Sequence, residues 1–427
     1  MTADARETVA AEIRAWLGEH WDPALALVEW RNRLAEAGWV KPSWPVGLGG
    51  GGLPEWADGV VAAALAEIDA PGPPGGVGMA LAAATIVERG SADVQQRFVP
   101  RTITGEYMWC QLFSEPGAGS DLAGVTTHAA PDGDSWIVNG QKVWNTSAHH
   151  ADYGILVART DWDAPKHSGL TYFVLPIHQP GVTVRPLRQM NGHASFNEVF
   201  LDDAVIPPGH VVGDVGSGWT VALTTLAHER SGFRRIMPVT RPVTDSTSDT
   251  GNGGAGRARA EADMERIVAS EPYTWYPQRT GRVDLLPERA RANRVAGDPV
   301  VRQAIARVHT LARIADWTAS RATAARSLGR PPGPEGSIGK LAASGIARAA
   351  AHTHGLIAGA AGLLSGTDGP VGGVIAEILV SVPAASIAGG TDEIQHNILA
   401  ERVLGLPKEP DMSATVPFRD VPRNALR

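Results

Sequence analysis

The chain has 427 residues, of which 43% are hydrophobic and 19% charged, and its formal net charge is −7. This is the composition of an ordinary globular protein, and the length exceeds what one hydrophobic core usually serves, so we expect two or three subdomains. The negative charge and the lack of a basic block argue against a nucleic-acid partner. The single cysteine, Cys110, excludes an internal disulfide framework, and its apolar neighbours favour a packing role.

Residues 1–108 form a predicted helical domain, with helices separated by Gly- and Pro-rich turns. Val9, Ile13 and Leu17 recur at helical spacing among acidic residues, which predicts an amphipathic helix and neither a signal nor a transit peptide. No uncharged apolar stretch reaches the roughly 18 residues that a membrane helix needs. We therefore expect a cytoplasmic protein that does not insert into a membrane.

Residues 109–215 form a predicted β domain, because the hydrophobic period shortens and turn residues become frequent. Short strands are expected at residues 155–158, 171–175, 182–184 and 198–201. Within this block, residues 136–138 read as a strand, Asn139-Gly140 as a tight hairpin turn, and residues 142–144 as the returning strand. This arrangement would place Trp144 and Thr146 on a rigid sheet edge.

Just before this predicted hairpin, residues 114–121 read SEPGAGSD. Pro116, Gly117 and Gly119 interrupt regular structure, and a Gly-rich turn lets backbone N–H groups approach a bound anion closely. Ser114 and Ser120 add hydroxyl groups that can form hydrogen bonds with a ligand. Alone, such a turn only connects elements in most proteins.

Residues 216–406 form a predicted second helical domain, followed by a tail at residues 407–427. Residues 242–258 are rich in Gly, Ser and Thr and predict a mobile loop, since they bury too little apolar surface to offset their ordering entropy. We expect the chain to stay irregular up to residue 296 and to resume a helix at residues 298–320. The family resemblance described below implies that the segment 236–296 is an insertion between two helices.

Three segments together carry a resemblance: residues 114–121, residues 138–146 (VNGQKVWNT) and residues 389–395 (GGTDEIQ). In this order, over this length, they resemble the acyl-CoA dehydrogenase family of flavoenzymes. The resemblance implies an α+β, mainly α fold, in which a small β domain lies between an N-terminal helical domain and a C-terminal domain like a four-helix bundle. It also implies FAD as cofactor and an acyl-CoA thioester as substrate.

The resemblance further assigns roles to individual residues. Trp144 would stack beside the flavin ring, while Ser114 and Thr146 would form hydrogen bonds with its polar edge. Ser120 and Arg230 would also contact the substrate. The remaining positions expected to contact FAD are Phe113, Gly119, Ser120, Arg294, Gly389, Gly390, Thr391 and Glu393.

The expected catalytic base is Glu229. Many family members carry a glutamate where this chain has Gly389, whereas a branch similar to isovaleryl-CoA dehydrogenase carries it on an earlier helix, directly before an arginine, as in Glu229-Arg230. If residues 218–233 form a helix, Glu229 shares a face with the apolar Ala222 and Leu226. Burial would raise the pKa of such a carboxylate toward neutrality, which suits a general base.

By resemblance, Glu229 would take the α-proton of a saturated acyl-CoA while the flavin accepts a hydride, leaving a trans-2-enoyl-CoA. Electrons would pass to an electron-transfer flavoprotein. The acyl group stays open among short branched, long-chain, steroid side-chain and carrier-bound classes. No metal site is expected, because His149 and His150 lack further ligands at metal spacing, and His193 is expected in a loop without a catalytic role.

Two segments depart from the family pattern, at residues 358–362 (AGAAG) and 294–297 (RVAG). Both lie where family members contact the outer half of FAD. The departures leave three possibilities: a homotetrameric dehydrogenase, one chain of a heterotetrameric dehydrogenase in which each subunit supplies half of a site, and a flavin monooxygenase of the same fold. The Glu229-Arg230 pair favours dehydrogenation.

Overall fold

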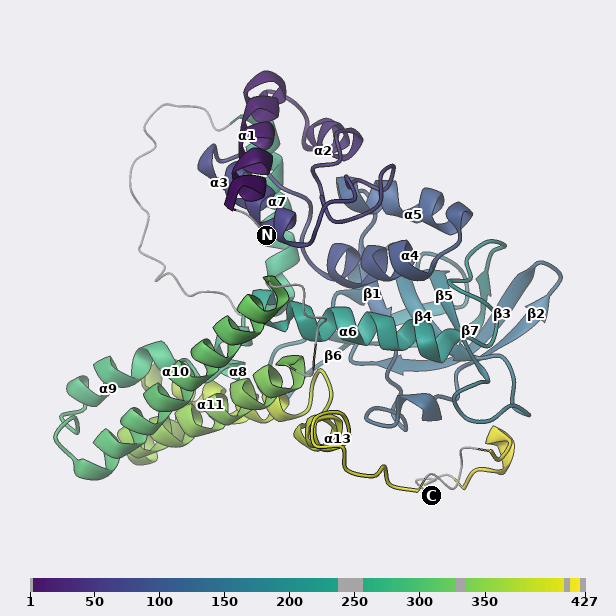
Figure 1. Ribbon diagram of the computed structural model, residues 1–427. Helices are drawn as coiled ribbons and strands as arrows, with labels where there is room; N and C mark the ends of the chain where they lie inside the picture. Colours follow the sequence, from purple (N-terminus) through teal and green to yellow (C-terminus); the bar gives the residue numbers. More distant parts are fainter. Residues whose placement is uncertain (1–2, 237–255, 328–332, 334, 411–414, 423–427) are drawn as a thin grey trace.

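The computed structural model describes residues 3–236, 256–327, 333, 335–410 and 415–422. It has three parts: N-terminal helices, a β-sheet that these helices cover on one face, and an arm of long C-terminal helices that extends away from the sheet (Figure 1). Helix α6 runs between the sheet and the arm. The predicted mixed, mainly helical fold class is confirmed.

The N-terminal helices are α1 (Ala3–His20), α2 (Leu27–Glu36), α3 (Trp56–Glu67), α4 (Ala84–Arg89) and α5 (Ala92–Thr104). In α1 the side chains of Val9, Ile13 and Leu17 are buried, which confirms the predicted amphipathic helix. Helix α5 begins after Ser91, whose side chain accepts a hydrogen bond from the Val94 amide, and ends at Gly105 in the left-handed conformation.

The sheet contains the strands β1 (Trp109–Leu112), β2 (His128–Asp132), β3 (Ser135–Val143), β4 (Tyr153–Arg159), β5 (Leu170–Pro176), β6 (Val182–Leu187) and β7 (Phe196–Ile206). Its order is β1-β4-β2-β3-β7-β6, and β5 pairs antiparallel with β4 along the whole length of β4. The four short strands expected from the sequence lie within β4, β5, β6 and β7, so their placement was right.

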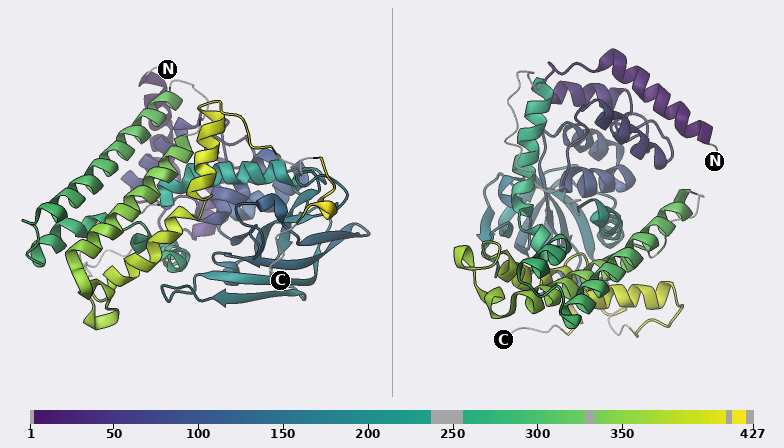
Figure 2. Two further views of the ribbon diagram at one scale, coloured as in Figure 1. Left: turned by 90° about the horizontal axis from the view of Figure 1, so that it is seen from below. Right: turned by 90° about the vertical axis from the view of Figure 1, so that its left-hand side faces the viewer.

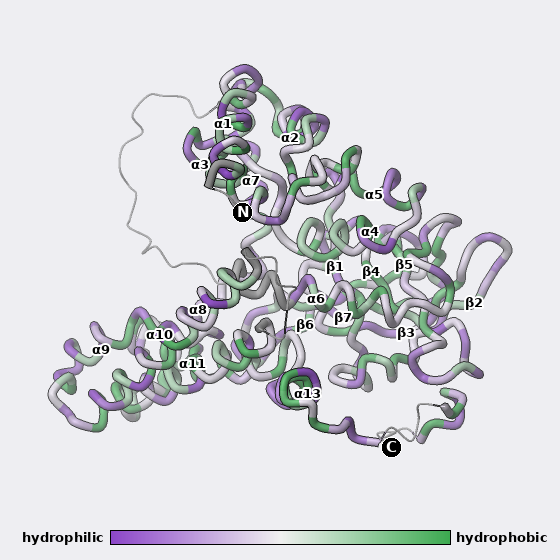
Figure 3. The backbone as a smooth tube through the Cα atoms, viewed as in Figure 1, coloured by the Kyte–Doolittle hydropathy of each residue, from purple (hydrophilic) through white to green (hydrophobic). Residues whose placement is uncertain are grey.

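Strands β4 and β5 are buried on both faces, and their side chains alternate between two cores. Ile155 and Val157 point into the core shared with the N-terminal helices and α6 (Gly218–Ile236), whereas Leu156 and Ala158 belong to the core on the opposite face. Hydrophobic residues concentrate along these strands, while the β2–β3 turn is hydrophilic (Figure 3). Cys110 is fully buried, and burial raises the pKa of its thiol to about 12, as fits a packing role.

The predicted hairpin turn at Asn139-Gly140 is wrong. Both residues lie inside β3, which pairs with β2 on one side and β7 on the other, and the turn is at Gly133 instead. The register with β7 shifts between Val138 and Gly140, which marks a bulge. Glycine is required because a Cβ at position 140 would lie 2.4 Å from the Thr127 hydroxyl oxygen.

The C-terminal helices are α7 (Arg257–Ser270), α8 (Tyr276–Arg279), α9 (Leu286–Ala292), α10 (Pro299–Ser327), α11 (Glu335–Ala358), α12 (Val374–Ser381) and α13 (Asp392–Arg402). Helix α10 confirms the helix expected at residues 298–320. Helices α10 and α11 lie side by side along the arm, as both views of Figure 2 show. Figure 1 places α9 at the distal end of this arm.

The expectation of irregular structure up to residue 296 is wrong for the part that the structure describes. Helix α7 packs against α2, where Glu265 forms an ion pair with the buried Arg31 and Glu261 accepts a hydrogen bond from the Leu27 amide. These long-range contacts stabilise a helix whose sequence has little apolar periodicity. Most of the predicted mobile loop at 242–258 lies outside the described residues. Among the helices of the described segments, none is long and apolar enough to cross a membrane.

Candidate functional site

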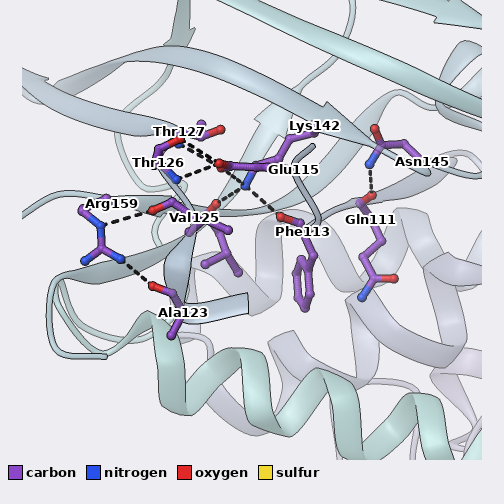
Figure 4. Close-up of polar contacts among 11 residues, drawn as sticks. Gln111, Phe113, Glu115, Ala123, Val125, Thr126, Thr127, Lys142, Asn145 and Arg159 are labelled. Carbon is purple, nitrogen blue, oxygen red and sulfur yellow. Dashed lines mark hydrogen bonds and ion pairs between the residues drawn. The ribbon is translucent and has the colours of Figure 1, made fainter. Parts of the chain in front are cut away.

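A buried ion pair joins two of the sequence motifs. The Lys142 ammonium group lies 2.9 Å from a carboxylate oxygen of Glu115 and also donates to the carbonyl oxygens of Phe113 and Val157 (Figure 4). Glu115 accepts two more hydrogen bonds from the backbone amides of residues 126 and 127. Burial opposes its ionisation, but Lys142 and these hydrogen bonds outweigh burial and lower the pKa of Glu115.

This pair holds the end of β1 against the end of β3. The Val143 amide donates to the Ser114 carbonyl at 2.9 Å. Figure 4 shows the Asn145 side chain, which donates to the Gln111 carbonyl at 2.7 Å. The residues that follow each strand, 114–121 and 144–146, therefore lie together at one edge of the sheet. The motif glycines Gly117 and Gly119 face open space.

Trp144 is the most unusual residue of this edge. Its backbone φ is +65°, and 56% of its surface is exposed although the indole is large and apolar. Only Phe196 meets it among the ring contacts of the described residues, edge-to-face at 5.7 Å. A tryptophan held in this way presents a flat apolar face for another ring system to stack on.

Glu229 lies on α6, half-buried, near two tyrosines of the segment between α7 and α9. Burial raises the pKa of Tyr273 and Tyr276, and the nearby negative charge of Glu229 raises both further. The neighbouring side chains of Arg279 and Thr146 partly oppose this rise in the pKa of Tyr276. A single tyrosine thus connects the strand end at Thr146 with the neighbourhood of Glu229.

Other predicted site residues of the middle domain differ in accessibility. Gly119 and Ser120 are exposed, and Ser114 is half-buried. The Phe113 side chain is buried edge-to-face against Tyr172, and its contact with FAD stays a prediction. The side chain of Arg230 lies outside the described part of the chain.

The C-terminal motif lies on a different element. The Thr391 hydroxyl accepts a hydrogen bond from the Ile394 amide and caps α13, while Glu393 is exposed. Gly389 and Gly390 both have positive φ, and the Gln395 side chain donates to the Gly389 carbonyl at 3.0 Å. These residues pack on the C-terminal helices, where α13 contacts α11.

Asp392, within the same motif, was not singled out from the sequence. Its buried carboxylate accepts hydrogen bonds from Lys340 and Ser344 and is paired with Arg348, all on α11. Burial opposes its ionisation, but these partners outweigh burial and lower its pKa well below the usual range. Arg294 stands exposed with φ +59° between α9 and α10, at the distal end of the arm.

One monomer therefore brings together Ser114, Trp144, Thr146 and Glu229, and leaves Arg294 and the motif at 389–393 on other elements. The sequence reading missed Tyr273, Trp275, Tyr276 and Arg279, which it assigned to irregular chain. The only available signal was the aromatic density of residues 273–276, since their partners are distant in sequence.

Comparison with known proteins settles the family. Models of the acyl-CoA dehydrogenase N-terminal, middle and C-terminal domains match residues 1–106, 110–204 and 252–404. The chain belongs to the acyl-CoA dehydrogenase family. It is 33% identical to acyl-CoA dehydrogenase IpdE1 of Mycobacterium tuberculosis over 94% of this chain and 98% of that protein.

A second family member, acyl-CoA dehydrogenase FadE34 of Mycobacterium tuberculosis, is 37% identical over 88% of this chain, which spans 46% of that relative's length. Among solved structures, the Tcur3481-Tcur3483 steroid ACAD matches with a TM-score of 0.64 and 23% identity, over 96% of this chain and 99% of that one. The ChsE4-ChsE5 complex from Mycobacterium tuberculosis matches with a TM-score of 0.60 and 24% identity, over 96% and 99% of the two chains. These structures support the fold.

Acyl-CoA dehydrogenases use FAD, and the residues at this sheet edge fit a flavin. The exposed face of Trp144 can stack on a planar ring, and the open turn at Gly117 and Gly119 leaves backbone amides accessible. A threonine hydroxyl has one donor and two acceptor positions. The half-buried Thr146 hydroxyl can therefore either donate to or accept from the polar edge of a flavin ring.

The fold also brings the Glu271 carboxylate close to His149 and His150, the two histidines that follow this sheet edge in the sequence. His149, His150 and Glu271 are exposed, and one possible ligand atom of each lies within 4.8 Å of the others. Glu271 is 121 positions along the chain from His150, so the sequence could not associate them. Exposed groups of this kind occur commonly without a metal ion, and the absence of a metal remains a prediction.

Proposed function

We propose that the chain catalyses FAD-dependent α,β-dehydrogenation of an acyl-CoA thioester, with Glu229 as the base. The observation that carries this proposal is the position of Glu229 relative to the strand end. Glu229 lies close enough to Tyr276 to influence its ionisation, and Tyr276 packs on Trp275, which is joined through Phe196 to Trp144 at the strand end. The reaction requires a carboxylate base on one side of the acyl group and a flavin on the other side, and the exposed indole of Trp144 provides the surface against which that flavin would stack.

Each proposed residue has a definite task. Glu229 takes the α-proton of the acyl group, and its half-buried position limits the water that competes for this proton. Trp144 and Thr146 orient the flavin, which supplies the hydride acceptor when bound. Hydrogen bonds to the thioester carbonyl are also needed, because an α C–H is too weak an acid without stabilisation of the developing enolate. The product is a trans-2-enoyl-CoA.

Ser120 and the backbone of the turn at 117–119 are the proposed contacts to the outer parts of the ligands, since they are exposed beside Trp144. We assign Arg230 to the substrate and Arg294, Gly389, Gly390, Thr391 and Glu393 to FAD. The second group lies on the C-terminal helices and the turns beside them, and in this proposal a second subunit brings it to the flavin.

A tetramer is the proposed assembly. Large apolar side chains are exposed on the C-terminal helices and the turns between them, notably Trp317 at 63%, Leu363 at 78% and Leu404 at 70% exposure. Exposed apolar surface of this kind marks interfaces. The electron acceptor is an electron-transfer flavoprotein in this proposal.

A heterotetramer is the second candidate, with one subunit supplying FAD contacts that the other lacks. Two observations favour it. Arg294 is exposed in a strained turn at the end of the arm, and two structural matches carry two-protein names, Tcur3481-Tcur3483 and ChsE4-ChsE5.

The test is the Glu229→Gln variant, assayed anaerobically by bleaching of the 450 nm flavin band with a panel of acyl-CoA thioesters. We expect the variant to retain FAD and to lose about 10²- to 10⁴-fold in bleaching rate, the usual contribution of a general base. Glu12→Gln, on the exposed face of α1, is the matched control. An unchanged rate in Glu229→Gln would exclude Glu229 as the base, and a colourless wild-type protein would favour the heterotetramer.

A further inference from the structure

The segment between α7 and α9 forms a rigid aromatic wall against the middle domain. Trp275 is only 1% exposed, and its indole N–H donates to the Ser195 hydroxyl at 2.8 Å. Tyr276 packs edge-to-face on Trp275 at 4.9 Å, and Tyr273 packs on Tyr276 at 4.7 Å. Because a buried hydrogen bond anchors its centre, this wall has a fixed position relative to the sheet.

Arg279, the last residue of α8, is buried behind this wall. Only 7% of its surface is exposed, and its guanidinium carbon lies 5.1 Å from the Tyr276 ring centre. Its Nη2 atom is buried and has no hydrogen-bond partner in the described residues. An arginine cannot release its charge by deprotonation, so a buried N–H group of this kind is costly until an acceptor meets it.

The hydrogen-bond acceptor that the Arg279 Nη2 group lacks would be supplied by a ligand in the site described above, and not by another part of the protein. Trp275 meets Phe196 edge-to-face at 6.1 Å, and Phe196 in turn meets Trp144, so a continuous row of rings joins the aromatic wall in front of this guanidinium to the strand end where the flavin is proposed. Glu229, the nearest carboxylate of α6 to this wall, influences both Tyr273 and Tyr276. A ligand between Glu229 and Thr146 would therefore lie within reach of this unpaired donor.

We propose that Arg279 and Tyr276 form a binding site for an oxygen atom of a ligand, a carbonyl or carboxylate oxygen, beside Glu229. This inference rests on the proposed function for the identity of the ligand. A guanidinium group and a phenol donate to such an oxygen with fixed geometry, and a charge-assisted hydrogen bond is about twice as strong as a neutral one. Two ligands present such an oxygen here: the pyrimidine ring of FAD, and an acyl group that carries a keto or carboxylate function.

Arg279→Met tests the site because it removes the charge and keeps most of the buried volume. Tyr276→Phe removes only the phenol oxygen. Arg291→Met, an exposed position on α9 in the same segment, is the matched control. FAD affinity is measured by titrating the apoprotein, and substrate affinity by anaerobic bleaching with pairs of thioesters of equal length, one plain and one bearing a terminal carboxylate or keto group.

We expect Arg279→Met to weaken one of these two interactions by about 10- to 100-fold, as for a hydrogen bond to a charged group. Loss of FAD affinity identifies the flavin as the source of the oxygen. Loss confined to the oxygenated thioesters, with plain thioesters unchanged, identifies the acyl group, and a merely structural residue would not produce that discrimination. Tyr276→Phe should change the same interaction by a smaller factor.

Thermal stability of the apoprotein provides a separate readout. Because the unpaired guanidinium is costly without its ligand, apo Arg279→Met should melt at the wild-type temperature or above it. If Arg279→Met instead melts well below Arg291→Met and binds both ligands normally, Arg279 is structural and the proposal is wrong. The proposal is equally wrong if Arg279→Met matches the control in every measurement.

Failure of the proposed function would look different. In that case the wild-type protein neither takes up FAD nor is bleached by any thioester, alone or with a co-purifying partner chain. Thermal-shift titration with glutarate then probes the site directly. Stabilisation of the wild type but not of Arg279→Met supports an oxygen-binding site, and no stabilisation of either overturns it.

Discussion

Lys142 and Glu115 form an ion pair in which the lysine side chain is fully buried and the glutamate side chain is 6% exposed. Lys142 belongs to the motif at residues 138–146, and Glu115 belongs to the motif at residues 114–121. The pair has further hydrogen bonds on both sides, so neither charge is left unsatisfied. It therefore sets the position of both strand ends that the proposed flavin site uses.

Removing one partner should be costly. Lys142→Met leaves the Glu115 carboxylate buried without its counterion, and we expect the free energy of unfolding to fall by about 3–5 kcal/mol. Urea denaturation followed by circular dichroism measures this change. Lys166→Met is the control, because Lys166 pairs with the largely exposed Asp121 and such a pair contributes only about 0–1 kcal/mol.

The double variant Lys142→Met with Glu115→Gln distinguishes charge from hydrogen bonding. The neutral side chain removes the unpaired charge, so part of the lost stability should return. Recovery should be incomplete, because the amides of residues 126 and 127 lose a charged acceptor. Equal stability of the single and double variants would contradict this account.

The sequence predicted the fold class, the β4–β7 strands and helices α1, α6 and α10 because their hydrophobic periods reflect local burial. It failed at Asn139-Gly140, where a dipeptide typical of turns is used for a bulge packed on Thr127, a contact that no local pattern encodes. It also missed the helical segment at 257–292, because α7 depends on an ion pair and a hydrogen bond with α2 and because the aromatic wall depends on Ser195. The unexpected site residues Tyr276 and Arg279 come from that same segment.

Gly140→Ala tests the bulge. The added Cβ would lie 2.4 Å from the Thr127 Oγ1 atom and 2.7 Å from its Cα, so backbone must shift. We expect a loss of at least about 1–3 kcal/mol in the free energy of unfolding, the usual cost of overpacking. Gly59→Ala is the control. Gly59 lies within α3 with open space around it, so alanine should be neutral or stabilise by about 0.5–1 kcal/mol. Similar effects of the two substitutions would show that the close approach at Gly140 is unimportant.

Asp392 should be a structural residue within the motif at 389–395. Asp392→Asn leaves the buried Lys340 ammonium group without a counterion, and we expect a loss of about 3–5 kcal/mol in the free energy of unfolding. Asp368→Asn, at an exposed position, should have little effect. If Asp392→Asn unfolds at the same urea concentration as the control while FAD affinity falls, the motif acts through ligand contacts rather than through this ion pair.

His354 should make stability fall in mild acid. Its ring Nε2–H donates to the Gly281 and Arg282 carbonyl oxygens, and its Nδ1 atom is buried with no hydrogen-bond partner in the described residues. Burial lowers the pKa of His354, although the two carbonyl groups partly oppose this effect. Protonation of Nδ1 would create a buried, positively charged ring whose Nδ1–H group has no hydrogen-bond acceptor among the described residues. The folded protein therefore disfavours this protonation.

The sign of the effect follows from proton linkage. Because the folded-state pKa lies below the unfolded value near 6.5, the unfolded chain binds the proton first as the pH falls. The contribution of His354 to stability is therefore complete above about pH 6.5 and is lost progressively below it. His210 is also buried with a lowered pKa, so it adds a contribution of the same sign. Urea midpoints measured from pH 8 to pH 5 should decline in the wild type.

His354→Gln should flatten this decline, since an amide does not titrate and can still donate to a carbonyl oxygen. The substitution should reduce the slope of stability against pH by nearly the amount expected for one proton. The slope that remains is the contribution of His210. His178→Gln is the control, because that side chain is 68% exposed. If the His354→Gln and wild-type proteins lose stability with the same slope between pH 7 and pH 5, the buried imidazole is not the group that titrates, and the decline must come from other residues.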